Sequence, residues 1–266
     1  MNYRNHRKIM VVDAKVAYLG GFNIGDEYLG KGELGEWRDT HMKIEGNAVL
    51  TLQSRFFMDW NAVAKEKNRK DYAEAYFPIA DKKGNTAMQI VTSGPDDEDQ
   101  TIKMGFLKMI SQAKESIYIQ TPYFIPDESL HEMLKIAVLS GVKVKIMIPS
   151  KPDHPFVYRA TEYFAKDIVE YGAEVYMYQN GFLHSKVIVV DDEIVSVGTA
   201  NMDVRSFKLN FEINAFIYDR DVAEELIANF DEDQKNCIRA THDYFAKQSK
   251  WRKFKQAFSR LLSPIL

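Results

Sequence analysis

Two hydrophobic periodicities alternate along the chain, and together they predict its helices and strands. Apolar residues that recur every three or four positions indicate amphipathic helices, and short alternating or continuous apolar runs indicate strands. The predicted helices are Ala48–Ala64, Thr101–Ala113, Glu128–Ser140, Pro155–Tyr171 and Val222–Asp233. The predicted strands include Thr40–Ile44, Met88–Val91, Ser116–Gln120, Val142–Ile148 and Ala173–Tyr178. Because strands and helices alternate over residues 86–178, we predict an α/β fold with a mostly parallel sheet flanked by helices.

An internal repeat joins the beginning of the chain to its last third. The pattern H-x-K-x4-D, followed by G-x-x-N, occurs twice with an offset of 178 residues and no gap. The matched pairs are His6/His184, Lys8/Lys186, Asp13/Asp191, Gly20/Gly198 and Asn23/Asn201. In each copy, turn residues separate two apolar runs, which predicts a hairpin with the return strands Val16–Leu19 and Ile194–Val197. The repeat indicates two similar units.

A second offset, of 173 residues, extends the repeat beyond the hairpins. It relates Phe57 to Phe230 and Asp39 to Glu212. The loop after Asn23 is therefore five residues longer than the loop after its counterpart in the second copy. Each acid lies on a strand after its asparagine, where a carboxylate can accept a hydrogen bond from a histidine ring and fix its tautomer. A carboxylate at the surface is the plainer alternative.

The repeated side chains favour the binding of phosphate. Alternate residues of a strand share a face, so the histidine and lysine of each copy lie together, and the asparagine returns beside them. Lysine binds phosphate as a point charge, whereas histidine can attack phosphorus or transfer protons. A metal site is not expected, because lysine offers no lone pair and the sequence has no Cys/His cluster with zinc spacing. One copy of such a pattern is easily due to chance, but two matched copies are not.

The paired pattern resembles the phospholipase D superfamily, and three further stretches resemble bacterial cardiolipin synthases more narrowly. They are Thr121–Asp127, Pro149–Tyr158 and Gly181–Glu212. The resemblance covers essentially the whole chain and implies two pseudo-repeated units whose motifs face each other. It also implies the site residues, which are His6, Lys8, Asp13, His184, Lys186 and Asp191 as catalytic, Asn23 and Asn201 as phosphate-binding, and Asp39 and Glu212 as histidine-orienting. By strand parity, Asp13 and Asp191 lie at the turns on the face opposite the lysines, and we interpret them as holding the hairpins.

The resemblance further implies a phosphatidyl transfer that uses neither metal nor cofactor. One histidine would form a covalent phospho-histidine, and the other would protonate the departing alcohol, so that two phosphatidylglycerol molecules give cardiolipin and glycerol. The alternatives are another phosphodiesterase of the superfamily, such as a phospholipase or nuclease, an inactive membrane-associated fragment, and an unstable partial chain. The expected partners are phosphatidylglycerol and an anionic membrane surface, at the cytoplasmic face of the cell membrane, and no nucleic acid.

Composition narrows the class of protein only slightly. A chain of 266 residues with 45% hydrophobic and 12% aromatic residues can bury a sizeable core in one or two domains. Its formal net charge of −3 argues weakly against a general nucleic-acid binder. The single cysteine, Cys237, excludes an intrachain disulfide. No apolar run reaches the roughly 18 residues that indicate a transmembrane helix.

We divide the chain into residues 1–85 and 86–240, which carry the two units, and a tail at residues 241–266. Because Met1 stands only five residues before His6, we expect the C-terminal part of a longer protein with an incomplete first unit; a naturally short protein is the alternative.

The tail predicts a basic amphipathic helix, since six basic residues and no acid follow Asp243. Its recurring apolar residues are Trp251, Phe254, Phe258, Leu261 and Ile265. Such a helix either lies on an anionic membrane or packs on the body of the protein.

Overall fold

The two predicted hairpins are present and share one turn geometry. The computed structural model describes residues 3–79 and 81–263. The first hairpin joins β2 (Ile9–Val12) to β3 (Val16–Gly20), and the second joins β12 (Val187–Val190) to β13 (Ile194–Gly198). The first two residues of each turn have φ values of 52–53°, in the left-handed region. Tight hairpin turns of this kind require that region, which aspartate tolerates better than most residues.

The central sheet has nine strands and is mixed, so the prediction of a mostly parallel sheet was wrong. Its order is β1-β15-β13-β12-β7-β9-β10-β16, and β6 also pairs with β15. Strands β7 (Ser116–Gln120), β9 (Lys143–Pro149) and β10 (Glu174–Tyr178) run parallel, as the alternating helices and strands indicate. Strands β12 and β13 are antiparallel to each other because a tight turn, rather than a helix, joins them. Strand β12 also pairs with β7 in the antiparallel direction. The remaining strands are β1 (Arg4–Asn5), β6 (Ala87–Ser93), β15 (Asn210–Tyr218) and β16 (Cys237–Arg239).

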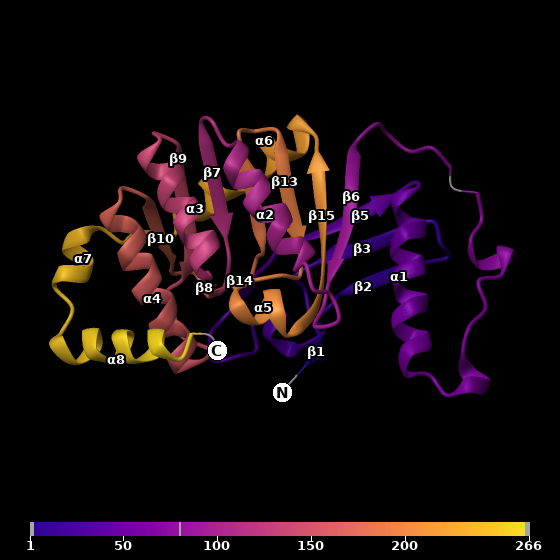
Figure 1. Cartoon of the computed structure of the whole chain (residues 1–266), viewed down its shortest axis with the longest axis horizontal. Coiled ribbons are helices and arrows are strands. Elements are labelled where there is room, and N and C mark those ends of the chain that lie inside the picture. The colour runs from indigo at the N-terminus through magenta and orange to yellow at the C-terminus, as the bar shows by residue number, and fades with distance from the viewer. Residues whose placement is uncertain (1–2, 80, 264–266) are drawn as a thin grey trace.

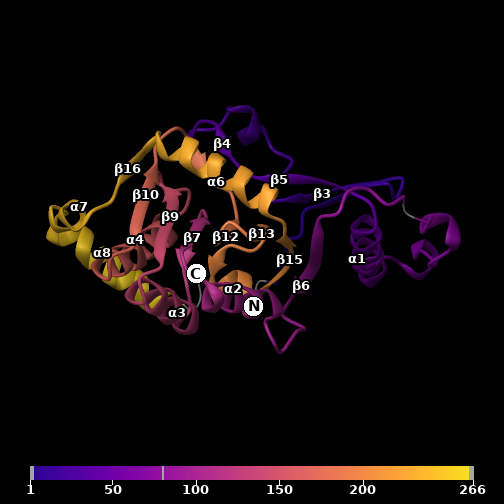
Figure 2. The same ribbon diagram turned by 90° about the horizontal axis from the view of Figure 1, so that it is seen from above.

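Helices cover both faces of the sheet, and five of them confirm the predicted positions to within two residues. These are α1 (Ala48–Val63), α2 (Thr101–Gln112), α3 (Glu128–Leu139), α4 (Pro155–Glu170) and α6 (Arg220–Gln234). Seen from above, α2, α3 and α4 lie on one side of the sheet and α6 on the other (Figure 2). Asp127 caps α3 by accepting a hydrogen bond from the backbone N–H of Leu130. The fold is therefore α/β, with a mixed central sheet.

The first unit contributes a separate three-stranded sheet, β2-β3-β5, in which β5 is His41–Glu45. Figure 1 shows this sheet and α1 beside the edge of the central sheet. One apolar cluster spans both units, because Leu19, Ile44 and Leu52 pack with Val189 and Val197 of the second hairpin. All five side chains are almost completely buried, and burying each contributes about 1.5–3 kcal/mol. This shared core fixes the two hairpins relative to each other.

The tail differs from the single helix predicted. It forms α7 (His242–Ala246) and α8 (Lys250–Leu261), because Ser249 caps a new helix by accepting a hydrogen bond from the N–H of Arg252. Ile265 lies outside the described residues. None of the described helices has both the length and the apolar character that crossing a membrane requires. The proposed boundaries after residues 85 and 240, and an incomplete first unit, stay predictions.

Candidate active site

Two short strand pairings cross between the units and bring the repeated motifs together. Strand β1, just before His6, pairs in parallel with β15 of the second unit. Strand β11 (Phe182–Leu183), just before His184, pairs in parallel with β4 (Trp37–Arg38) of the first unit. The backbone N–H of His6 then donates to the carbonyl of Phe211 at 2.9 Å, and that of His184 donates to the carbonyl of Arg38 at 2.8 Å. Each histidine therefore enters the site beside the acid of the other unit.

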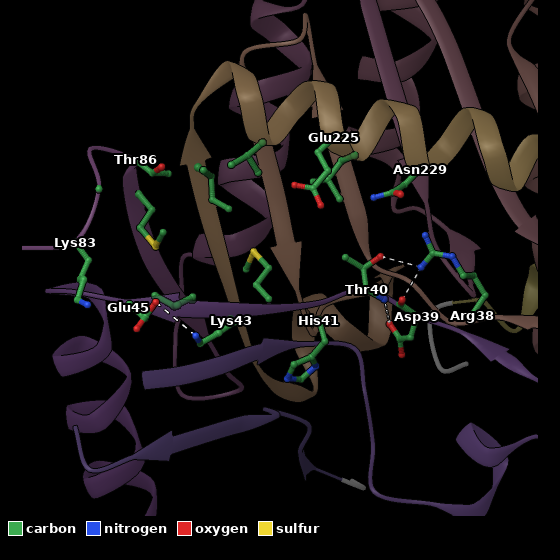
Figure 3. A pocket seen from close by; sticks show the side chains of 17 residues that line it. Arg38, Asp39, Thr40, His41, Lys43, Glu45, Lys83, Thr86, Glu225 and Asn229 are labelled. Carbon is green, nitrogen blue, oxygen red and sulfur yellow. Dashed lines mark hydrogen bonds and ion pairs between the residues drawn. The ribbon is translucent and has the colours of Figure 1, made fainter. Parts of the chain in front are cut away.

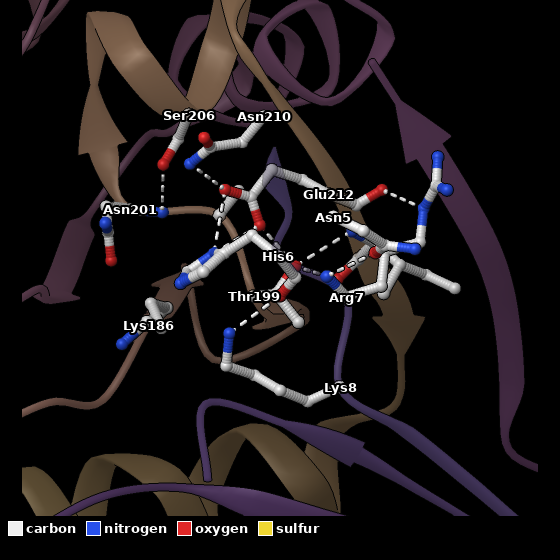
Figure 4. Close-up of polar contacts among 12 residues, drawn as sticks. Asn5, His6, Arg7, Lys8, Lys186, Thr199, Asn201, Ser206, Asn210 and Glu212 are labelled. Atoms are coloured by element: carbon white, nitrogen blue, oxygen red, sulfur yellow. Dashed lines mark hydrogen bonds and ion pairs between the residues drawn. The ribbon is translucent and has the colours of Figure 1, made fainter. Parts of the chain in front are cut away.

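The first half of the site is the pair His6–Glu212. The Nδ1 atom of His6 lies 2.9 Å from both carboxylate oxygens of Glu212, which is fully buried. The Thr199 hydroxyl donates to the same carboxylate at 2.5 Å, and the Asn210 amide donates to it at 3.1 Å. Figure 4 shows these side chains converging on Glu212. With Nδ1 engaged by a carboxylate, Nε2 is the ring nitrogen of His6 that can react.

The second half is the pair His184–Asp39. The Nδ1 atom of His184 lies 2.7 Å from Oδ2 of Asp39, and Tyr28 places its hydroxyl 2.9 Å from both of these atoms. Burial, together with the charge of Lys186, lowers the pKa of His184 to about 3. Burial alone would raise the pKa of Asp39, but the charge of Lys186 and the hydrogen bond with His184 lower it below its usual value. The ring is thus neutral and the carboxylate ionised, which is the state that holds the Nδ1–H tautomer.

Tyr28 supplies in the first unit what Thr199 supplies in the second, namely a hydroxyl that donates to the orienting acid. The residue matched to Thr199 is Gly21, and a Cβ there would lie 2.2 Å from Oδ1 of Asp39, so no larger side chain fits. Burial and the Asp39 charge raise the pKa of Tyr28, which keeps it a phenol and a donor. Neither hydroxyl was predicted from the sequence. The available signal was the longer loop after Asn23, because that loop carries Tyr28.

Lys8 and Lys186 lie between the two acids. Each Nζ donates to the backbone carbonyl of its own histidine, at 2.7 Å for Lys8. Burial lowers the pKa of Lys8 to about 8 and that of Lys186 to about 7, while the charges of Asp39 and Glu212 act on both lysines in the opposite direction. The positive charge of Lys8 further lowers the pKa of Lys186. The two half-sites therefore form a single charged centre.

The two asparagines differ in their surroundings. Asn201 is buried, and one of its two amide protons is directed to Asp203 at 3.2 Å. Its Oδ1 atom is buried and has no hydrogen-bond partner among the described residues. Asn23 is half-buried in the loop that leads into the short 3₁₀ helix η1 (Asp26–Leu29), and the described contacts include no hydrogen bond of its carboxamide. Phosphate binding by either asparagine stays a prediction.

Asp13 and Asp191 lie at the hairpin turns, at the opposite ends of their strands from the histidines. The Asp191 carboxylate accepts hydrogen bonds of 2.7, 2.8 and 2.9 Å from the backbone N–H groups of residues 114–116. Asp13 is exposed at the corresponding turn. The contacts of Asp191 support a role in holding its hairpin, and the same role for Asp13 stays a prediction.

Aromatic rings surround His184, and the sequence analysis did not single them out. Trp37 lies with its ring centroid 5.0 Å from that of His184, and it also packs against Phe182 and Tyr28. These rings reach the site through β4, β11 and the loop at residues 21–30. They bury His184, whose side chain is 7% exposed, more deeply than His6, whose side chain is 24% exposed.

Two further features flank the centre. The hydroxyl of Tyr123 donates to Asp153, and this contact joins the loops that follow the parallel strands β7 and β9. A groove between β5 and α6 reaches Asp39, and His41 lines it (Figure 3). Neither His6 nor His184 lines that groove. Among the described residues, no group of three or more His, Cys, Asp or Glu side chains is arranged to hold a metal ion.

Comparisons with known proteins identify the family of the chain. Residues 106–234 match the family model described as cardiolipin synthase, PLD-like domain. The chain belongs to the phospholipase D superfamily. It is 57% identical to cardiolipin synthase from Listeria welshimeri and 55% identical to the major cardiolipin synthase ClsA from Bacillus subtilis. Both alignments cover all of this chain and 55% of the relative, so the chain spans about half the length of these proteins.

Solved structures confirm the fold of this superfamily. The phosphatidylserine synthase from Haemophilus influenzae matches 98% of this chain and 71% of its own, with a TM-score of 0.72 and 18% identity. The phospholipase D family member Nuc from Salmonella typhimurium matches 59% of this chain and 99% of its own, with a TM-score of 0.52 and 22% identity. Identities this low show the fold alone.

Proposed function

We propose that this chain carries the catalytic centre of a cardiolipin synthase, which joins two phosphatidylglycerol molecules into cardiolipin and releases glycerol. The single observation that carries the proposal is the reciprocal pairing of two histidines with two acids across the units, with two lysines between them. The names of its relatives support phosphatidylglycerol chemistry over other phosphodiester chemistry.

The mechanism follows from the two imidazoles. Nε2 of one histidine attacks phosphorus, the P–O bond to glycerol breaks, and the other histidine, as an imidazolium, gives its proton to the departing oxygen. In the second step the now neutral imidazole takes the proton of the acceptor hydroxyl, whose oxygen attacks phosphorus and releases the first histidine. Protons and bonds balance over the two steps. In this proposal Lys8, Lys186, Asn23 and Asn201 stabilise the charge on the non-bridging oxygens, and the electrostatic coupling of the two lysines supports this role.

A product assay tests the proposal. The chain, alone and preceded by the upstream sequence of its gene, is incubated with phosphatidylglycerol vesicles and, separately, with single-stranded DNA. Cardiolipin and glycerol in equal amounts are the expected products, and the yield should survive dialysis against EDTA. Phosphatidic acid alone would indicate a phospholipase, and cleaved DNA a nuclease; either result without cardiolipin contradicts the proposal. A loss of activity restored by a stoichiometric divalent ion would contradict the metal-free mechanism.

Anion binding should weaken as the pH rises. The pKa of Lys186 is about 7 and that of Lys8 is about 8, so the free site loses positive charge above these values. An anion binds the protonated form of each lysine. Above the pKa of a lysine, that lysine must regain a proton before the anion binds, so the affinity falls about tenfold for each further pH unit. Titration with tungstate between about pH 6 and about pH 9 should therefore show tight binding at the acid end and progressive loss toward the basic end.

The matched variant is Lys8→Arg, because a guanidinium stays protonated throughout this range. The variant should retain more of its affinity at the basic end than the unsubstituted chain. A tungstate affinity that does not change with pH in the unsubstituted chain would show that the buried lysines keep their charge, contrary to this expectation.

A further inference from the structure

The C-terminal helix α8 is attached to the protein by its polar face. Gln256 and Ser259 are 2% and 1% exposed, respectively, and lie on the side of the helix that packs against α4. Arg252 and Gln256 both donate hydrogen bonds to Glu162 of α4, which is completely buried. Arg159, one turn earlier in α4, donates to the same carboxylate, and the two donors from α8 satisfy more of its hydrogen-bonding capacity. Glu162 therefore fixes the orientation of α8 about its own axis.

The opposite face of α8 is apolar and points to solvent. Trp251, Phe254, Phe258 and Leu261 are 64%, 59%, 47% and 71% exposed, respectively. Their spacing of three and four residues places them on one face of the helix. Helices on the surface of a globular protein normally bury their apolar face, and α8 does the reverse. Such a contiguous, exposed apolar face indicates a surface that contacts something else.

Basic residues frame this apolar face. Lys250 and Lys255 are exposed and lie one turn from Phe254 and Trp251, respectively, and no acidic residue follows Asp243 in the chain. Lys255 lies over the ring of Trp251, with its Nζ 5.2 Å from the centroid, and Trp251 stacks on Phe254. A helix with aromatic and aliphatic residues on one face and lysines at its flanks matches the boundary between headgroups and acyl chains of an anionic bilayer.

We propose that α8 is a docking surface for an anionic bilayer, with its apolar face inserted among the acyl chains and its lysines at the phosphates. The chemistry of the occupant follows from charge complementarity: a lysine-framed apolar face fits a negative interface. Figure 1 shows α8 along the lower edge of the molecule, with β1, the strand before His6, also near that edge. Docking through α8 brings the same edge toward the lipid. The inference is independent of the proposed phosphatidyl transfer, because binding needs no turnover.

Sedimentation with vesicles tests the proposal. The vesicles contain phosphatidylcholine with or without phosphatidic acid, a phosphomonoester that is no substrate for phosphodiester transfer, and the protein carries His184→Ala. Binding is expected only with the anionic lipid and should fall as salt increases. Trp251→Ser with Phe254→Ser should lower the partition coefficient at least tenfold. Lys250→Gln with Lys255→Gln should lower it by about 25-fold, since each lysine near an anionic surface contributes about a factor of five.

The control is Ile136→Ser with Leu139→Ser on α3, which are 55% and 70% exposed and should leave vesicle binding unchanged. Quenching of Trp fluorescence by brominated lipid should occur and should disappear in Trp251→Phe. Equal binding by the α8 variants, or quenching that survives Trp251→Phe, would overturn the proposal. Self-association of the protein without lipid that the Trp251→Ser, Phe254→Ser variant abolishes would instead assign the face to a second copy, and would also overturn it.

Discussion

Replacing either histidine of the centre with alanine is expected to lower cardiolipin formation by about a thousandfold or more, because a nucleophile and its proton-transfer partner act as one unit. His6 and His184 each have Nδ1 held by a carboxylate, so each has one ring nitrogen to offer to the substrate. Loss of the nucleophile removes the covalent intermediate. Loss of the proton donor leaves an alkoxide that departs poorly. Product formation by each variant against the unsubstituted protein measures the effect.

A second substrate separates the two roles. A phosphodiester with a p-nitrophenol leaving group departs without being protonated, so the variant that lacks the proton donor should still cleave its first bond and accumulate phospho-histidine. The variant that lacks the nucleophile should remain inactive toward both substrates. This comparison assigns the nucleophile, which the repeat in the sequence leaves undetermined because both copies carry the same residues.

The matched control is His242→Ala at the start of α7, whose side chain is 73% exposed and lies outside the site. It should leave turnover unchanged. All three alanine variants should unfold at a similar temperature. Near-normal cardiolipin formation by His6→Ala or His184→Ala would refute the two-histidine mechanism.

The helices and hairpins were predictable because the local spacing of apolar residues determines both the type of element and the side chains that it buries. The four apolar residues Val187–Val190 are all buried, and α3 begins at Glu128, where the sequence predicts it. The order of strands was less accessible. Alternating strands and helices suggest parallel neighbours, but β12 and β13 are joined by a turn and insert antiparallel beside β7. No local pattern encodes which strand a hairpin will join.

The matched acids were identified from the repeat, but their partners were not. Spacing relates Asp39 to Glu212 without indicating which histidine each one contacts. The answer depends on β1 and β11, two-residue strands that cross to the other unit and are too short to produce a periodic signal. Tyr28 was not predicted because it lies in an insertion that has no counterpart in the second copy. A comparison of the two copies therefore gives no matching residue that would indicate its role.

The crossed pairing leads to the second large effect, expected for Asp39→Asn. The Asp39 carboxylate accepts the Nδ1 proton of His184. An asparagine of the same shape can donate to Nδ1, which moves the proton to Nε2 and leaves the reactive nitrogen without its lone pair. The equivalent change in a serine protease triad lowers kcat about 10⁴-fold. We expect a loss of about 10³- to 10⁴-fold in cardiolipin formation, whereas Asp192→Asn, at an exposed hairpin turn where asparagine tolerates the left-handed backbone, should have no effect.

A spectroscopic readout determines which histidine responds. Nitrogen chemical shifts of the imidazole rings should show that Asp39→Asn changes the tautomer of His184 and leaves His6 unaltered. Glu212→Gln should do the reverse, since Glu212 contacts His6 at 2.9 Å. Tyr28→Phe removes one donor to Asp39 and should disturb only His184, with a smaller loss of turnover because the carboxylate remains. If each acid variant instead changed the histidine of its own unit, the crossed strand pairings β1–β15 and β4–β11 would be wrong. The acids would then orient their histidines within each repeat.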